Sequence, residues 1–484
     1  MRGRKLRLTL VAVVILSLFL RLFNLTSLFH FTMDEELIAW RALGLFSYHR
    51  PFLIGGISPL QIHLPPYFYY LASLLLWPFK FNPAGWGVSG ALLGGITTVV
   101  LFGFARRLTN ARIALIAAVL YATSQAAVFA DRHFWPLSLN PLLTLLSLIF
   151  LKSKNYWALI ATLVLAITAD PSNLPLALVM AGAAVWRNYA KWKQIGKPFL
   201  TGALVFLAPL ILFDLRHQGE NVKGIVKLFS RVAGQGLSLT GLADGLLLLP
   251  KTLTQFWWTG QTKVVEMLGY CFPHAQFRQQ VPLLLLLLSV AILILVWRKL
   301  PQVLHYLFIV YAAGLGLFGF LGYPVFDHYL TGWLPLFALF TALALDYLPK
   351  TLGAGLAIGL VVINLWQIFK TTNPYGLSYK QELVVWANQQ LNGRPFALDS
   401  DSKCHKENGL RYLFELSGNP PETSFMDGNF GWLYKTPPGT TSPQLYLLVT
   451  DKDLLISQPV IISRQFGAMK ALITAEPVVP ANQE

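Results

Sequence analysis

Long apolar stretches recur through the first three quarters of this 484-residue chain, separated by short polar segments. A helix needs about 20 apolar residues to cross a bilayer, and fewer when charged side chains at its ends snorkel to the interface. The pattern predicts eleven spanning helices, near residues 6–24, 84–104, 112–130, 134–151, 155–169, 171–186, 198–213, 281–297, 301–321, 329–347 and 351–369. The first follows the basic segment RGRKLR and precedes no small-x-small cleavage site, so we interpret it as an uncleaved span.

The pattern changes after about residue 371, where charges and prolines become frequent and long apolar runs stop. Helices are expected at 378–391 and near 407–416, and short strands at 395–399, 444–450 and 459–464. We therefore predict two domains: a helical transmembrane domain over residues 1–370 and a small α/β domain over residues 371–484.

Composition supports the membrane interpretation. The chain is 55% hydrophobic and 12% charged, about half the charged fraction of a soluble domain. Its net charge of +16 comes from basic residues scattered over short loops, a pattern that argues against nucleic acid as a partner. With the N-terminus in the cytoplasm these basic loops lie inside, which predicts a multi-pass cell-membrane protein whose C-terminal domain is on the outer side.

Acidic residues show the opposite distribution. Of those before residue 370, only Asp346 falls on the inner side in this topology. Acids contribute little to membrane insertion, so the bias directs attention to chemistry on the outer face. Two outer loops are long, about 25–83 and 214–280, and their amphipathic, aromatic-rich stretches predict helices in the membrane interface.

The first outer loop begins with FTMDEELIAW, which holds three consecutive carboxylates. A structural alternative is strong here, because Thr32-x-x-Glu35 is a capping box and acids in a first turn suit the helix dipole. Capping explains Glu35 best, Glu36 in part and Asp34 least. Asp34 is therefore the best candidate for chemistry in this cluster.

Further ionisable residues lie where outer loops meet spans. They occur in HLPPYFYYL, DRHFWPLSLNP, ADPSN, FDLRHQGEN and YPVFDHYLTGWLP. Each stretch has an ordinary alternative, such as an interfacial histidine, a snorkelling arginine or a tight turn. Their shared position on one face is the stronger signal, because an ionisable residue at membrane depth is a functional candidate.

MDEE in the first outer loop, followed by HLPPYFYYL, resembles the GT-C membrane glycosyltransferases. The nearest branches are the bacterial relatives of protein O-mannosyltransferases (glycosyltransferase family 39) and of the lipid A aminoarabinose transferases (family 83). DRHFWPLSLNP, FDLRHQGEN and DHYLTGWLP are similar to stretches at corresponding places in that group, and the resemblance covers roughly residues 6–347.

The resemblance implies inverting transfer of a sugar from a polyprenyl phosphate to an acceptor on the outer face. In it, Asp34 acts as general base and Glu35 matches the second acid of the pair. The chemistry of the reaction requires the same residue types. The attacking group must lose a proton to a base such as a carboxylate, and the leaving phosphate must be stabilised by cations. Substrate-binding candidates are His63, Arg132, Asp214, Arg216, His217, Asn221, His328 and Tyr329, with Arg132 and His328 assigned to the phosphate.

Several points stay open at this stage. No inserted sugar-binding domain is recognisable, so the acceptor is a lipid, a glycan or a protein, and the sugar is not specified. No organic cofactor is expected, and a divalent metal fits as well as none. A flippase for lipid-linked saccharides and a non-catalytic envelope assembly protein are the alternatives, although no inverted repeat of the transporter kind is visible. The sequence does not determine whether Cys271 and Cys404 form a disulfide.

Overall fold

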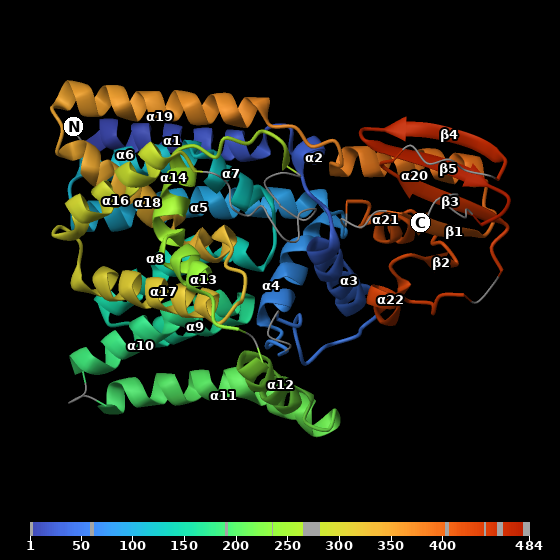
Figure 1. Ribbon diagram of the computed structural model, residues 1–484, viewed down its shortest axis with the longest axis horizontal. Coiled ribbons are helices and arrows are strands. Elements are labelled where there is room, and N and C mark those ends of the chain that lie inside the picture. Colours follow the sequence, from blue (N-terminus) through green and yellow to red (C-terminus); the bar gives the residue numbers. More distant parts are fainter. Residues whose placement is uncertain are drawn as a thin grey trace.

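The computed structural model describes residues 3–58, 62–188, 192–234, 236–264, 281–401, 406–439, 442–452 and 458–477. Within these ranges the chain forms a body of long helices and a smaller part that contains a β-sheet, placed end to end along the longest axis (Figure 1). Cys271 and Cys404 lie outside the described residues, so the structure does not address a disulfide between them.

The long helices of the body are largely those predicted from the apolar pattern, and each predicted span lies mainly on helical residues. They are α1 (Gly3–Leu22), α5 (Ala84–Leu108), α6 (Ala111–Thr123), α7 (Gln125–Arg132), α8 (Asn140–Ser153), α9 (Tyr156–Ala169), α10 (Leu174–Asn188), α11 (Trp192–Arg216), α16 (Leu283–Trp297), α17 (Gln302–Phe320), α18 (Leu334–Asp346) and α19 (Lys350–Lys370).

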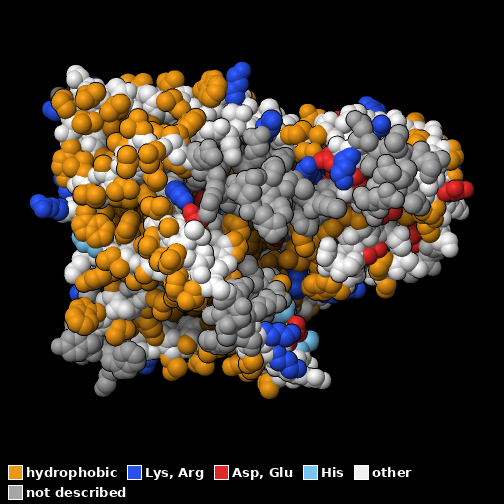
Figure 2. Space-filling view, viewed as in Figure 1, with side chains coloured by type: hydrophobic (Ala, Val, Ile, Leu, Met, Phe, Trp, Pro, Cys, Tyr) orange, Lys and Arg blue, Asp and Glu red, His pale blue; other side chains and the backbone are white. Residues whose placement is uncertain are grey.

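Within the described ranges, six helices are long and apolar enough to cross a membrane, or up to seven if the bent pair α6–α7 counts as one span. Three further apolar helices are shorter than that limit. The chain is a multi-pass membrane protein, and the figure of eleven spans stays a prediction. Apolar side chains cover much of the body, whereas most visible acidic side chains lie on or near the C-terminal part (Figure 2).

The first loop forms helices where amphipathic segments were predicted. α2 (Leu25–Leu28), α3 (Met33–Ser47) and α4 (Tyr67–Leu76) precede the short 3-10 helix η1 (Trp77–Phe79). α3 and α4 run across the ends of the long helices, between the body and the sheet (Figure 1). The second long loop adds α12 (Glu220–Gly234), α13 (Leu239–Leu246) and α14 (Leu248–Trp257).

Short 3-10 turns join helices at the end of the body that faces the sheet. They are η2 (Pro136–Leu139), η3 (Pro171–Asn173) and η5 (Asp327–Trp333). In the first two, proline occupies one of the first two positions, where its missing N–H costs no hydrogen bond. These turns carry much of the polar sequence that was singled out above.

The C-terminal part is a mixed sheet with helices. Its strands are β1 (Phe396–Ser400), β2 (Thr423–Ser424), β3 (Leu445–Thr450), β4 (Val460–Phe466) and β5 (Met469–Thr474), in the order β2-β1-β3-β5-β4. β1 is parallel to β2 and β3, and β5 is antiparallel to β3 and β4. The helical elements are α20 (Leu377–Leu391), α21 (Leu410–Leu416), α22 (Asp427–Phe430) and η6 (Gly431–Leu433).

This sheet shares its apolar core with the first loop. A single buried cluster runs from Phe31 and Trp40 on the first-loop side, through Phe68 of α4, to Tyr412 of α21 and Leu447 of β3. The hydrophobic effect therefore ties the C-terminal part to α3 and α4. The proposed boundary at residue 370 coincides with the end of α19 but does not separate two cores.

Two glycines of α5 allow a close approach of neighbouring helices. A Cβ at Gly90 would clash with the backbone of Asp131, and one at Gly94 would clash with the side chains of Arg21 and Asp131. The small-xxx-small pair at Gly355 and Gly359 has no such role, because a Cβ at either meets nothing within 4 Å among the described residues.

Candidate functional site

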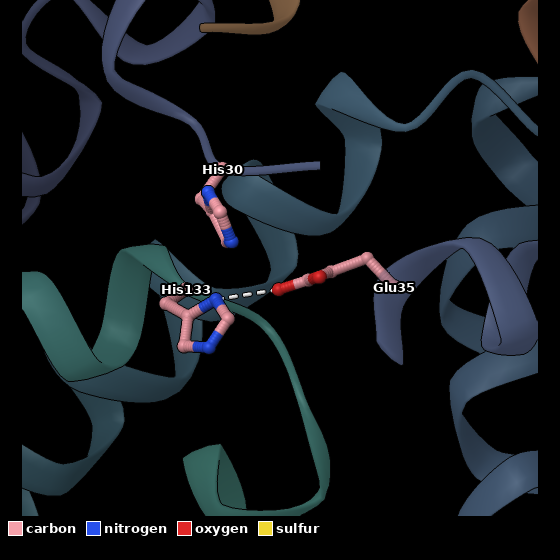
Figure 3. Close-up of side chains that lie close together, drawn as sticks. All are labelled: His30, Glu35 and His133. Atoms are coloured by element: carbon pink, nitrogen blue, oxygen red, sulfur yellow. Dashed lines mark ion pairs between the residues drawn. The ribbon is translucent and has the colours of Figure 1, made fainter. Parts of the chain in front are cut away.

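Three buried side chains converge where the first loop meets the body (Figure 3). Glu35 lies in the first turn of α3, His30 three residues before that helix, and His133 directly after α7. Glu35 Oε1 is 2.5 Å from His133 Nδ1, and the rings of His30 and His133 are 5.2 Å apart. The three side chains are 0–6% exposed.

Glu35 serves both of the roles weighed from the sequence, with a different oxygen for each. Oε2 accepts the Thr32 backbone N–H and the Thr32 hydroxyl, both at 3.2 Å, which fixes the start of α3. Oε1 faces His133. Capping thus positions the carboxylate, and the second oxygen stays available to the cluster.

The last two residues of α7 explain the position of His133, which follows them. Asp131 pairs with buried Arg21 of α1 at 2.6 Å. Arg132 donates through Nε and one terminal nitrogen to the carbonyls of Arg21 and Leu20. These bonds fix the end of α7 against the end of α1, and His133 follows as the chain turns.

Arg132, which was predicted to contact the phosphate, makes hydrogen bonds to the end of α1. Its two hydrogen bonds satisfy carbonyls at the last turn of α1, which would otherwise lack partners. The side chain is 5% exposed. The structure thus gives Arg132 a helix-capping role, and a contact with phosphate stays a prediction.

Asp34 is the member of the acidic cluster that water reaches. Its side chain is exposed, whereas Glu35 and Glu36 are fully buried. Within the described ranges, no hydrogen bond or ion pair engages the Asp34 carboxylate. Even so, protein surrounds it closely enough that burial, and then the charge of Glu35, raise its pKa to about 6, against an opposing effect of His133.

Asp34 has further polar neighbours. The charge of Asp170 also raises its pKa, so this residue of the turn between α9 and η3 lies near the same site. Burial raises the pKa of the Tyr69 phenol, and the charge of Asp34 raises it further. Tyr69 of α4 therefore also lies near Asp34. The Asp170 carboxylate accepts the Ser172 N–H at 2.7 Å and is thereby held in place.

His328 and Tyr329 lie on an aromatic path that leads to His133. The ring of Trp135 is 4.5 Å from His133 and 5.1 Å from His328. Tyr329 follows His328 at 4.7 Å, edge to face. η5 thus contributes to the wall around the buried cluster, although no hydrogen bond to Asp34 or Glu35 involves either residue within the described part of the chain.

The remaining predicted residues form a second cluster where the first loop meets α11 and α12. The Asn221 amide oxygen accepts the His63 backbone N–H at 2.8 Å, and Asp214 accepts the Asn221 N–H at 2.9 Å. His63 also lies 3.4 Å from Glu220. Arg216 and His217 are exposed, and no described contact links this cluster to Asp34. It acts as a joint between loops, and substrate binding there stays a prediction.

The buried trio has donor atoms that suit a divalent metal ion. One ligand atom from each residue can be chosen so that all lie within 4.8 Å of one another. Burial, then His133 and Lys380, hold the pKa of His30 well below its usual range, so its imidazole is neutral, the form that binds metal. Neither ring nitrogen of His133 makes a hydrogen bond within the described part of the chain.

Two imidazoles and a carboxylate form the donor set of many catalytic zinc sites, in which a fourth position stays open. The residues present therefore fit a zinc-like ion. Sequence reasoning missed His30 and His133 as members of the site, although DRH was singled out for its arginine. The available signal was a histidine, His30, just before the acidic residues, and another, His133, at the end of a predicted span. The sequence does not specify that these two histidines meet.

No protein-family model and no curated protein sequence matches the chain. Solved structures do match. The fold is similar over nearly the whole chain to that of ArnT, a member of the group of membrane glycosyltransferases that the sequence resembles. The apo structure of ArnT from Cupriavidus metallidurans aligns with a TM-score of 0.57 at 13% identity, over 98% of each chain.

The same enzyme bound to undecaprenyl phosphate aligns with a TM-score of 0.54 at 12% identity, over 97% of this chain and 98% of that one. The archaeal oligosaccharyltransferase AglB from Archaeoglobus fulgidus, in complex with an inhibitory peptide and a dolichol-phosphate, has a TM-score of 0.45 at 11% identity. It aligns over 93% of this chain and 70% of its own, and the comparison of folds rests on ArnT.

Proposed function

We propose that this protein transfers a sugar from a polyprenyl-phosphate-linked donor to an acceptor at the outer face of the membrane, with inversion at the anomeric carbon. The observation that carries the proposal is Asp34, an accessible carboxylate without a protein partner, enclosed by polar groups in an ArnT-like fold. The donor class follows from the polyprenyl phosphate bound to ArnT.

The chemistry requires a base and a stabilised leaving group. Asp34 takes the proton of the acceptor hydroxyl or amine, whose lone pair forms a bond to the anomeric carbon. The bond between that carbon and the phosphate oxygen breaks, and the polyprenyl phosphate leaves with the electron pair. A pKa of about 6 keeps Asp34 ionised at neutral pH while making it a stronger base than an ordinary aspartate.

The neighbouring groups hold the base and tune it. Thr32 fixes Glu35, and while no ion is bound to Glu35 its negative charge increases the proton affinity of Asp34. His30, Glu35 and His133 are the residues that would hold a divalent ion, and such an ion would supply a Lewis acid at the start of α3. The outer orientation and the cell-membrane localisation belong to this proposal.

A donor panel tests the proposal. Purified protein in lipid nanodiscs receives radiolabelled sugars on a polyprenyl phosphate, together with lipid, glycan and protein acceptors. We expect labelled product with at least one combination, and Asp34→Asn should retain donor binding while losing transfer. A flippase or an assembly protein would give no transfer with the native chain, and donor translocation or assembly would survive in Asp34→Asn.

A further inference from the structure

Arg41 is a buried cation whose charge is balanced by no acidic group among the residues that the structure describes. It lies in the middle of α3, and its side chain is 7% exposed. Within the described ranges the guanidinium makes no ion pair or hydrogen bond, and its Nε is buried without a partner. Burial accordingly lowers the pKa of Arg41.

Two aromatic rings hold the guanidinium in place. Phe52 of the first loop and Trp432 of η6 each have their ring centroid 4.7 Å from Arg41 Cζ. Phe52 in turn stacks on Tyr70 at 4.5 Å, so the arginine belongs to a layered stack that joins α4 to the C-terminal part. Stacking uses the faces of a guanidinium and leaves the donors on its edge free.

A buried charge without a partner is costly unless something else supplies the opposite charge. The fork of an arginine edge matches the oxygens of a phosphate or a carboxylate, to which it donates two parallel hydrogen bonds. A ligand with such a group is therefore the partner that the arrangement lacks. The two rings fix the orientation of the fork in advance, which reduces the entropy cost of binding.

Arg41 also has a defined position relative to the proposed base. It lies seven positions after Asp34, which is about two helical turns, so both side chains leave the same face of α3 about 10 Å apart along the axis. Tyr69 lies near both, since the charges of Asp34 and Arg41 act on its phenol in opposite directions. Within the described residues, Asp34 and Arg41 do not pair with each other.

We propose that Arg41 is an anion subsite that binds a phosphate group of a substrate, two turns of α3 away from Asp34. The inference rests on the proposed function, because base and leaving phosphate lie on opposite sides of the anomeric carbon in an in-line displacement. The polyprenyl carrier is the first source of such a phosphate, and a phosphorylated acceptor is the second.

Binding of simple probes to the native full chain tests the subsite without turnover. Farnesyl phosphate, farnesol and inorganic phosphate are titrated against the protein in nanodiscs. We expect farnesyl phosphate to bind more tightly than farnesol, and Arg41→Met to weaken farnesyl phosphate about 10- to 100-fold while leaving farnesol unchanged. Arg394→Gln, which alters an exposed arginine three residues after α20, is the matched control.

Arg41→Lys keeps the charge and most of the packing but loses the fork, so it should retain part of the affinity and guards against misfolding of the Met variant. Inorganic phosphate that binds in an Arg41-dependent way, without preference for the farnesyl chain, would support the subsite and assign it to the acceptor. Equal farnesyl phosphate affinity in the native chain and both variants would overturn it. That failure is distinct from failure of the proposed function, which appears as missing transfer.

Discussion

Glu35 Oε1 lies 2.5 Å from Nδ1 of His133, the residue that follows the bent helix pair α6–α7. The contact joins the start of α3 to the end of α7 and brings His30 into the same buried group. It shows that the acidic cluster is divided in space: Glu35 turns inward to two imidazoles, and Asp34 turns to where water enters.

The buried trio of His30, Glu35 and His133 predicts metal binding. We expect the purified chain to bind Zn²⁺, and Glu35→Gln or His133→Asn to weaken that binding at least about 10-fold, because each substitution removes one of three donors. Isothermal titration after chelator treatment measures the affinity. His305→Asn, which alters a histidine bonded to the carbonyl of Trp297, is the control. Unchanged Zn²⁺ affinity in both site variants would contradict a metal site here.

Lys380 predicts a pH dependence of stability. It is fully buried and donates to the carbonyls of Phe31 and Asn408, both at 2.6 Å, so it ties the C-terminal part to the loop before α3. Burial lowers its pKa to about 8, partly offset by Glu407, Glu36 and Glu35. Between pH 8 and about 10.5 the unfolded chain binds more protons at this lysine, so its contribution to stability rises with pH in that window.

The full effect of that shift is at most about 3 kcal/mol. Thermal unfolding in detergent between pH 7.5 and 10 measures it, with Lys380→Met compared with Lys350→Met, an exposed lysine at the start of α19. We expect the rise with pH to be smaller in Lys380→Met by that contribution. Identical pH slopes in the two variants would show that Lys380 is not titrating as described.

Arg132 predicts a loss of stability rather than of substrate affinity. Its guanidinium caps α1 through the carbonyls of Arg21 and Leu20, so Arg132→Gln should lower the free energy of unfolding by about 1 to 3 kcal/mol. Donor KM should stay within about threefold of the native value, since both observed bonds are internal. A large rise in KM with unchanged stability would instead restore the phosphate role first expected for it.

Sequence periodicity located the helices because apolar runs must be helical in a bilayer, and short apolar runs in the C-terminal part located β1, β3 and β4. It missed β5, whose residues follow directly on β4 through a turn at Gly467 with positive φ. β2 is two residues long and exists only by pairing with β1, so no local pattern marks it.

The site was predicted unevenly for a physical reason. Asp34 stood out because capping did not account for it, and this is a local argument. His133 and Arg41 depend on contacts across the fold: His133 on the placement of α7 against α1, and Arg41 on rings from two separate segments. Such contacts leave no local spacing to read. His63 and Asn221 were predicted to bind substrate, but their described contacts join two loops, and substrate binding there stays a prediction.

The raised pKa of Asp34 predicts the acidic limb of the activity profile. Below pH 6 the carboxylate is protonated and does not accept a proton from the acceptor, so kcat/KM should fall about tenfold per pH unit. The profile is measured between pH 4.5 and 8.5 in nanodiscs with a fixed donor. A limb centred near pH 4, the usual range of an aspartate, would mean that the surroundings of Asp34 do not shift it in the active protein.

The most direct test of the account compares kcat/KM for sugar transfer in Asp34→Asn and in Glu382→Gln, which alters an exposed carboxylate of α20. Measured at pH 8, where the base is ionised, Asp34→Asn should lose about 100- to 10,000-fold while still binding farnesyl phosphate, and Glu382→Gln should match the native protein. Transfer by Asp34→Asn within a few-fold of native would contradict Asp34 as the base.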